Sequence, residues 1–214
     1  MPQPPPQNPQ SQNLPPAHLA AQTITYQSTF TAAALILTAS RKATLSVFSI
    51  IIPERTTTEG ILVRSTSQVW NEIVQTLGND WTVAYQIPPD KWEEIVAGAF
   101  NKAKYDEVTL TPRSGDHGRD VIAIKHGIGC VKIIGSVKRY APGNLVDYND
   151  IRALLGVLSG ERDASKGIIT TTSDFPPLVK EDPFIGPFIP TRLELMNGEA
   201  LQKWLQELAA NEAK

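Results

Sequence analysis

The chain has 214 residues, which is enough for one domain of ordinary size and an additional segment. Its net charge of −2 argues against a protein coated in positive charge for non-specific binding of nucleic acid, although a local basic groove is compatible with it. The single cysteine, Cys130, excludes a disulfide within the chain and fits a reducing compartment.

The first part of the chain predicts a disordered tail followed by a β-rich extension. The tail, residues 1–22, is rich in Pro and Gln and cannot bury enough apolar surface to fold. In the extension, residues 23–87, the runs TLSVFSIII and GILVRS indicate strands, AAALILTA fits a strand or a helix, and an apolar stripe after Ser67 indicates a linking helix that stops at Gly78. We find no signal-peptide pattern and no membrane-spanning run, and therefore expect a cytoplasmic protein without membrane contact.

The remaining region, residues 88–212, alternates helices and strands. An apolar stripe predicts a helix over Asp90–Lys104, and the strand-like runs EVTLT, RDVIAIK and GCVKIIGSVK follow it. A helix near Tyr148–Leu158, the buried strand KGIITTT, a proline-rich loop, the strand RLELMNG and a last helix complete the region. This order predicts an α/β fold in which helices flank a β-sheet, with an αβββαβ core.

Three polar residues are expected at one edge of this sheet. Ser136 and Lys138 lie two apart near the end of a strand and share its face, and Asp120 opens the preceding strand across a short hairpin. The carboxylate of Asp120 and the backbone carbonyl of Val137 are hard oxygen ligands of the kind that Mg²⁺ prefers, and a lysine stabilises negative charge on a phosphate. The pattern thus predicts a candidate site for phosphodiester hydrolysis.

The helix at Asp90–Lys104 carries two adjacent glutamates with different expected surroundings. At about 100° per residue, Glu93 lies on the flank of the apolar stripe and can lean towards the sheet, whereas Glu94 is expected in solvent. The run that begins at Asp90 also fits a capping box, with Asp90 as N-cap and Glu93 three residues later, so Glu93 has a structural alternative.

The segment SGDHGRD has two interpretations, a plain turn braced by Asp116 or a weak phosphate cradle. Neither His117 nor His126 has the spacing of a metal ligand. The sequence contains no Cys-x-x-Cys, His-Glu-x-x-His, P-loop or nucleophile elbow, so no organic cofactor site is predicted.

Taken together, the motifs resemble those of the Mrr-like restriction endonuclease family, within the PD-(D/E)xK nuclease superfamily. KWEEIVAGAF is similar to the family's first helix with its aromatic-Glu pair, LTPRSGDHGRDVIAI to its TP-x-x-GD-x-G-x-D segment, and SVKRY to its Glu/Gln-x-Lys-Arg-Tyr strand end. The runs IRALLGVL, KGIITTTSDF and LELMNGEALQKWL follow in the family's order. The resemblance covers about residues 88–208.

The resemblance implies the mixed β-sheet of restriction endonucleases and a Mg²⁺-dependent endonuclease, with Mn²⁺ as a substitute ion. The expected substrate is double-stranded DNA, cut in the restriction of foreign or modified DNA. Carried onto this chain, Asp120 is the central metal ligand, Lys138 the catalytic lysine, and Glu93 the helix carboxylate that assists the site. A homodimer is expected, because cutting both strands usually needs two sites.

Ser136 departs from this pattern, because the family has Glu or Gln at that position. Its neutral hydroxyl should lower the affinity of the site for a metal ion. One interpretation is that Asp150 or Asp147, at the start of the next helix, supplies the missing carboxylate, as in restriction enzymes with a Ser-x-Lys version of the site. The alternative is a catalytically inactive nuclease fold that serves as a DNA-binding or protein-interaction module.

Overall fold

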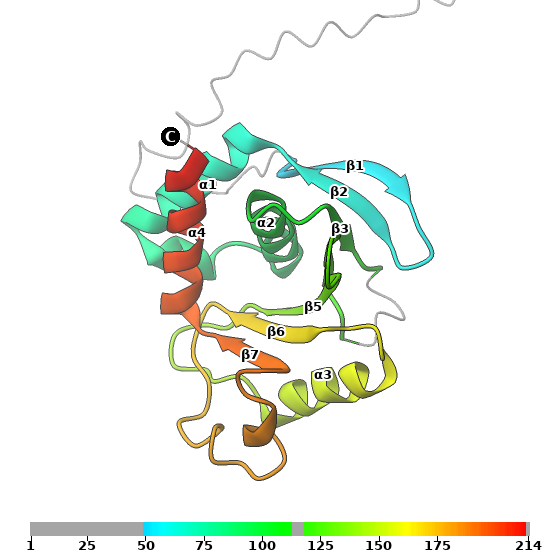
Figure 1. Ribbon diagram of the computed structural model, residues 1–214. Helices are drawn as coiled ribbons and strands as arrows, with labels where there is room; N and C mark the ends of the chain where they lie inside the picture. The colour runs from blue at the N-terminus through cyan, green and yellow to red at the C-terminus, as the bar shows by residue number, and fades with distance from the viewer. Residues whose placement is uncertain (1–48, 113–117, 213–214) are drawn as a thin grey trace, which may run out of the picture. The chain divides into compact units, whose positions relative to one another are not determined.

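The structure of the protein is a computed structural model that describes residues 49–112 and 118–212 (Figure 1). Several sequence predictions fall outside these residues. They are the tail at residues 1–22, the run AAALILTA, the first five residues of TLSVFSIII, and the turn residues Asp116 and His117. Within the described residues, no helix is both long and apolar enough to cross a bilayer.

A seven-stranded mixed sheet organises the described residues, and its strands follow one another in space as they do in the chain. The first five strands pair antiparallel, and the last two continue parallel to the fifth. The strands are β1 (Ile51–Thr56), β2 (Ile61–Ser65), β3 (Glu107–Leu110), β4 (Val121–Lys125), β5 (Val131–Lys138), β6 (Lys166–Thr171) and β7 (Leu193–Met196).

Helices cover both faces of this sheet. The helices are α1 (Ser67–Asn79), η2 (Trp81–Tyr85, a 3-10 helix), α2 (Pro89–Lys102), α3 (Tyr148–Gly160), η3 (Gly186–Phe188, a 3-10 helix) and α4 (Gly198–Glu212). Along the chain, α2, β3, β4, β5, α3 and β6 give the predicted αβββαβ core, and the predicted α/β class is confirmed. In Figure 1, α3 lies on the opposite side of β5 and β6 from α2.

Alternating side chains in β4 and β5 divide the core between the two faces. Val121 and Ile133 are buried in the cluster that contains α1, α2 and α4, whereas Ile122 and Ile134 are buried in the cluster that contains α3. Successive strand residues point to opposite faces, so both faces of these central strands need apolar cover. This alternation fixes which residues at the strand ends can meet.

The N-terminus of α2 differs from its sequence prediction. The N-cap residue is Pro88 and Pro89 occupies the first helical position, where its fixed φ suits the helix and its missing N–H costs nothing. Asp90 is therefore the second helical residue, and the predicted capping box with Asp90 as N-cap is wrong. At the other end, the helix stops at Lys102 and Lys104 adopts a left-handed φ of 64°.

The expected exposure of Glu94 is also wrong. Its side chain is only 16% exposed, and Oε1 lies 2.6 Å from Nζ of Lys91. Gly98, one turn further along α2, packs so closely on Trp70 of α1 that an added Cβ would lie 2.4 Å from the indole Cδ1. A helical wheel assumes water on the side away from the sheet, but α1 packs there and α2 becomes an enclosed helix.

The predicted extension shares the sheet and the core with the region after residue 88. Ile61 of β2 pairs with Leu110 of β3, and the side chains of Trp70 and Trp92 are buried in the same cluster. The division of the chain into residues 23–87 and 88–212 stays a prediction, and it rests on sequence motifs alone.

Candidate active site

The predicted site residues lie at the open end of the β4–β5 hairpin. Val121 pairs with Gly135, and the amide of Asp120 donates to the carbonyl of Gly135 at 2.9 Å, so Asp120 lies directly across from Ser136. Residues paired in this way point to the same face, which here is the face covered by α3. Lys138 is two residues beyond Ser136 and shares that face.

The carboxylate of Asp120 reaches the backbone of β5. Its Oδ2 accepts a hydrogen bond from the amide of Val137 at 2.5 Å. In an antiparallel ladder the N–H and C=O of one residue point towards the same neighbour, so the carbonyl of Val137 also faces the side of Asp120. A carboxylate and a carbonyl thus converge at this end of the hairpin, and both are oxygen donors of the type that hard divalent cations bind.

Lys138 meets a carboxylate from the first turn of α3. Its Nζ lies 3.2 Å from Oδ1 of Asp150, and the two side chains are 27% and 26% exposed. The hydroxyl of Tyr140 donates to the other oxygen, Oδ2, at 2.9 Å. Burial, and then the contact with Asp150, raise the pKa of Tyr140 to about 12, so this hydroxyl keeps its proton at neutral pH.

Of the two α3 carboxylates left open by the sequence, the structure brings only Asp150 to Lys138. Asp147 is the N-cap of α3, and its Oδ1 accepts a hydrogen bond from the amide of Asn149 at 2.7 Å. Asp147 therefore has a capping role, which stabilises the start of the helix that carries Asp150.

The remaining predicted residues have distinct surroundings. Ser136 is 2% exposed, and its carbonyl accepts from the hydroxyl of Thr170 on β6 at 3.4 Å. Glu93 is partly buried on α2, which packs against the opposite face of β4 and β5 through Val96 and Phe100. The predicted role of Glu93 in assisting the site stays a prediction.

No group of three or more His, Cys, Asp or Glu residues within the described ranges is arranged to hold a metal ion. The carboxylate of Asp120 and the carbonyl of Val137 still fit a divalent cation, because Mg²⁺ commonly keeps several waters and binds one or two carboxylates together with substrate phosphates.

Sequence reasoning missed the contribution of Tyr140. It follows Lys138 by two residues, so the alternation rule used for Ser136 and Lys138 would have placed it on the same side of the extended chain. Its contact with Asp150 needs the position of α3, however, which no pattern in the sequence supplies.

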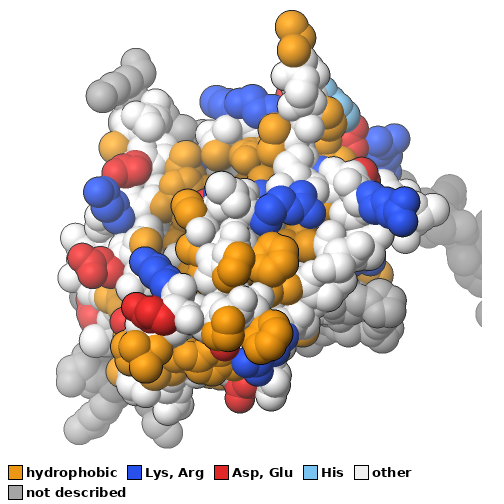
Figure 2. Space-filling model, turned by 60° about the horizontal axis from the view of Figure 1, so that its bottom comes forward, with side chains coloured by type: hydrophobic (Ala, Val, Ile, Leu, Met, Phe, Trp, Pro, Cys, Tyr) orange, Lys and Arg blue, Asp and Glu red, His pale blue; other side chains and the backbone are white. Residues whose placement is uncertain are grey.

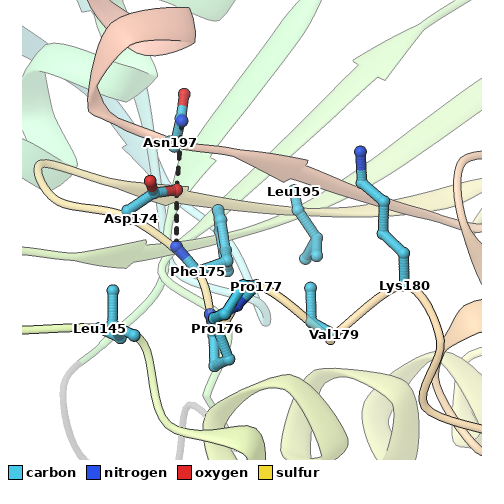
Figure 3. A pocket seen from close by; sticks show the side chains of 9 residues that line it. All are labelled: Leu145, Asp174, Phe175, Pro176, Pro177, Val179, Lys180, Leu195 and Asn197. Carbon is cyan, nitrogen blue, oxygen red and sulfur yellow. Dashed lines mark hydrogen bonds between the residues drawn. The ribbon is translucent and has the colours of Figure 1, made fainter.

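A cavity of about 540 Å³ opens at the carboxyl ends of β6 and β7 (Figure 3). In Figure 3, Asp174 lies between Asn197 and Phe175, and its Oδ1 accepts from the side-chain amide of Asn197 at 3.2 Å and from the backbone amide of Phe175 at 2.8 Å. The carbonyl of Asp174 accepts from the amide of Val146 at 3.0 Å. This wall of the cavity therefore braces the segment between β5 and α3 that leads to Asp150.

The surface on this side of the molecule mixes apolar and charged groups. Figure 2, which brings the lower end of Figure 1 forward, shows hydrophobic side chains interspersed with Lys and Arg and with Asp and Glu. Leu178 and Phe184, from the segment between β6 and β7, are 66% and 73% exposed.

One family model matches this chain. The family model Mrr_cat, described as "Restriction endonuclease", matches residues 84–205, which is more than half of the chain. No curated protein matches the sequence.

Two solved structures are similar in fold. A complex of the MspJI restriction endonuclease with a 27-mer oligonucleotide has a TM-score of 0.44 and 17% identity, over 69% of this chain and 36% of its own. The DNA modification-dependent restriction endonuclease AspBHI has a TM-score of 0.43 and 17% identity, over 68% of this chain and 40% of its own. The chain thus spans less than half the length of either protein.

Proposed function

Because the chain belongs to the restriction endonuclease family described by Mrr_cat, we propose that it is a metal-dependent endonuclease that hydrolyses phosphodiester bonds of double-stranded DNA. Restriction of foreign or modified DNA is the proposed role. The observation that carries the proposal is the hydrogen bond from the Val137 amide to the carboxylate of Asp120 at the open end of the β4–β5 hairpin. It is supported by the ion pair between Lys138, on the same face of the sheet, and Asp150.

Asp120 and the carbonyl of Val137 are the groups that would hold a divalent cation, Mg²⁺ or its substitute Mn²⁺, and Glu93 would assist from α2. When bound, such a cation lowers the pKa of a coordinated water and neutralises charge on the phosphate. The hydrogen bond from the Val137 amide holds one oxygen of Asp120 in place, so the carboxylate needs little reorganisation on binding.

Lys138 would contact the substrate. Its ammonium can donate to an oxygen of the scissile phosphate or orient the attacking water, and it stabilises the negative charge that grows during hydrolysis. Asp150 directs this ammonium from α3. We propose that Asp150 substitutes for the carboxylate that is missing at position 136. Asp150 is the α3 carboxylate in contact with Lys138, whereas Asp147 caps the helix.

We also propose that the protein acts as a homodimer, because a double-strand break needs two phosphodiester bonds to be cut. Sedimentation of the protein with and without a DNA duplex tests this step. A monomer in both samples would restrict the proposal to nicking of one strand at a time.

The proposed activity is tested by incubating the full chain with supercoiled plasmid, prepared with and without methylated cytosine, in Mg²⁺, Mn²⁺ or EDTA. Nicked or linear DNA with either metal and none in EDTA is the expected result. A second candidate function, an inactive nuclease-fold module that binds DNA or protein, is favoured by Ser136 and by the lack of a three-residue metal cluster in the described ranges. DNA binding without cleavage in any metal would select that candidate.

A further inference from the structure

Four residues from three elements form a continuous series of hydrogen bonds and one ion pair that ends at Lys138. The hydroxyl of Thr172 accepts from the amide of Tyr140 at 2.9 Å and donates to its carbonyl at 2.7 Å. The hydroxyl of Tyr140 donates to Oδ2 of Asp150 at 2.9 Å, and Oδ1 of Asp150 lies 3.2 Å from Nζ of Lys138. The series thus joins the end of β6, the end of β5 and the first turn of α3.

We propose that Tyr140 is a positioning residue, which acts through Asp150 to hold the ammonium of Lys138 at the scissile phosphate. This inference rests on the proposed function, because it assigns Tyr140 a part in the same site. Tyr140 itself does not touch the substrate in this proposal.

The reason is geometric. A lysine has a flexible four-carbon stem and three rotatable donors, so its position is defined only by what its ammonium contacts. Here the contact is Asp150, and a carboxylate held at one oxygen alone can still turn about its own side-chain bonds. The hydroxyl of Tyr140 holds the second oxygen, and the two contacts together fix the plane of the carboxylate.

Tyr140 is itself well anchored. Both backbone groups of Tyr140 are bonded to Thr172, which is 2% exposed, and the Tyr140 ring packs against the cluster that contains α3. The anchor therefore connects the rigid end of β6 to Lys138 through a short series of bonds. Such support is needed because a catalytic group displaced by about 1 Å loses much of its effect.

Tyr140→Phe is the variant that tests the proposal, because it keeps the ring and removes one hydroxyl. Tyr148→Phe is a matched control, since Tyr148 also packs against the α3 cluster and its ring lies 5.4 Å from the guanidinium of Arg152. For the parent, both variants, Asp150→Asn and the Tyr140→Phe/Asp150→Asn double variant, we would measure single-turnover plasmid cleavage, DNA affinity in Ca²⁺ and thermal unfolding.

Loss of a hydrogen bond to a charged group should slow cleavage by Tyr140→Phe about 10- to 100-fold. DNA affinity should change less than about twofold, because Tyr140 acts on the orientation of Lys138 and not on binding. The double variant should cleave as slowly as Asp150→Asn alone, since both changes break one series of contacts. Tyr148→Phe should match the parent. Parent-like cleavage by Tyr140→Phe would overturn the proposal. It would also be overturned if Tyr140→Phe lowered the cleavage rate by the same factor in the parent and in Asp150→Asn.

A second measurement does not depend on cleavage. Nitrogen-15 spectra of the lysine ammonium groups should show an ordered Lys138 signal in the parent and in Tyr148→Phe, and a broadened or absent one in Tyr140→Phe. An unchanged Lys138 signal in Tyr140→Phe would contradict the positioning role, even if the protein cleaves no DNA. If the parent fails to cleave but the Lys138 signal depends on Tyr140, the proposed function fails while the contact assigned here stands.

Discussion

The Nζ atom of Lys138, at the end of β5, lies 3.2 Å from Oδ1 of Asp150 in the first turn of α3. This pair connects the end of β5, which carries the proposed catalytic lysine, to the helix that follows it. The sequence alone does not distinguish Asp150 from Asp147, but their contacts differ, because Asp147 caps α3 through the amide of Asn149. Substitutions of the two residues should therefore have different effects.

Asp150→Asn should reduce metal-dependent cleavage by about 10²-fold or more, because Lys138 loses the charged group that directs it. Asp147→Ala should retain most of the activity and lower the free energy of unfolding by about 0.5–2 kcal/mol, through loss of the helix cap. Cleavage rates over a Mg²⁺ titration, together with urea unfolding, separate the two effects. The assignment of Asp150 would be wrong if Asp147→Ala abolished cleavage and Asp150→Asn did not.

Ser136→Glu should lower both activity and stability. The position is 2% exposed and lies on the same face as Lys138, so the new carboxylate would be buried close to the Lys138–Asp150 pair. Ser136→Ala, the matched control, should stay close to the parent in both respects. Plasmid cleavage across a Mg²⁺ titration provides the comparison. If Ser136→Glu instead worked at a lower Mg²⁺ concentration than the parent, Asp150 would not be filling the place of the missing carboxylate.

Gly98→Ala should destabilise the fold by about 1–3 kcal/mol, because the added Cβ would lie 2.4 Å from Cδ1 of Trp70 and force α1 away from α2. Gly156→Ala is the control, since its position in α3 has open space for a Cβ, and this change should stabilise by about 0.5–1 kcal/mol. Urea unfolding of the two variants checks the prediction. Equal stability of both would contradict the close packing of α1 on α2.

Lys132 holds three carboxylates together and should matter for stability. Its Nζ lies 3.1 Å from Glu59, 3.2 Å from Glu161 and 3.0 Å from Asp163, and its side chain is 10% exposed. Lys132→Met should cost about 2–4 kcal/mol at pH 7, because three neighbouring carboxylates would lose their shared cation, although Glu161 would keep its contact with Arg119. Lys166→Met, which removes a cation that is paired with Glu194 and is 26% exposed, should cost less than about 1 kcal/mol.

The same cluster gives a pH dependence. The hydrogen bond from Lys132 holds the pKa of Asp163 below its usual value. A lowered carboxyl pKa contributes stability above the unfolded value, and this contribution is lost as the pH falls through the folded value. The free energy of unfolding of the parent should therefore fall from about pH 5 downwards. Lys132→Met should have a lower free energy of unfolding at neutral pH, and this value should fall less over the same pH range. Parallel pH profiles of unfolding for the two proteins would refute the coupling.

Part of the fold follows directly from sequence patterns. Period-two alternation in VKIIGSVK correctly separates Ile133, on the α2 side, from Ile134, on the α3 side, and the same rule places Ser136 and Lys138 on one face. These predictions succeed because strand direction is a local property. The αβββαβ order succeeds for the same reason, since each element has its own apolar period.

Predictions that depend on packing between distant elements were less successful. The sequence pattern predicts Asp90 as the N-cap of α2, but the N-cap is Pro88, two residues earlier, and Pro89 begins the helix because proline fits its first position. The pattern also predicts Glu94 in solvent, but the packing of Trp70 on Gly98 shows that α1 covers this helix. Nothing in the sequence of α2 reports the position of α1.

Within the candidate site, the sequence could not rank Asp150 above Asp147. Both lie at the start of the same predicted helix, and the difference depends on which residue serves as N-cap and on how α3 docks against β5. The docking brings the carboxylate three residues after the cap to Lys138. That relationship belongs to tertiary structure and is invisible in a pattern of residue types.

The proposed function assigns to Asp120 the metal-binding carboxylate of an active DNA endonuclease. It is tested most directly by the single-turnover rate of supercoiled plasmid cleavage in Mg²⁺ by the parent and by Asp120→Asn, with Asp163→Asn as a control at an exposed carboxylate away from the site. We predict metal-dependent cleavage by the parent and by Asp163→Asn, and a loss of about 10³-fold in Asp120→Asn with DNA binding retained. Equal cleavage by the parent and Asp120→Asn, or no cleavage by the parent in any divalent metal, would contradict this assignment.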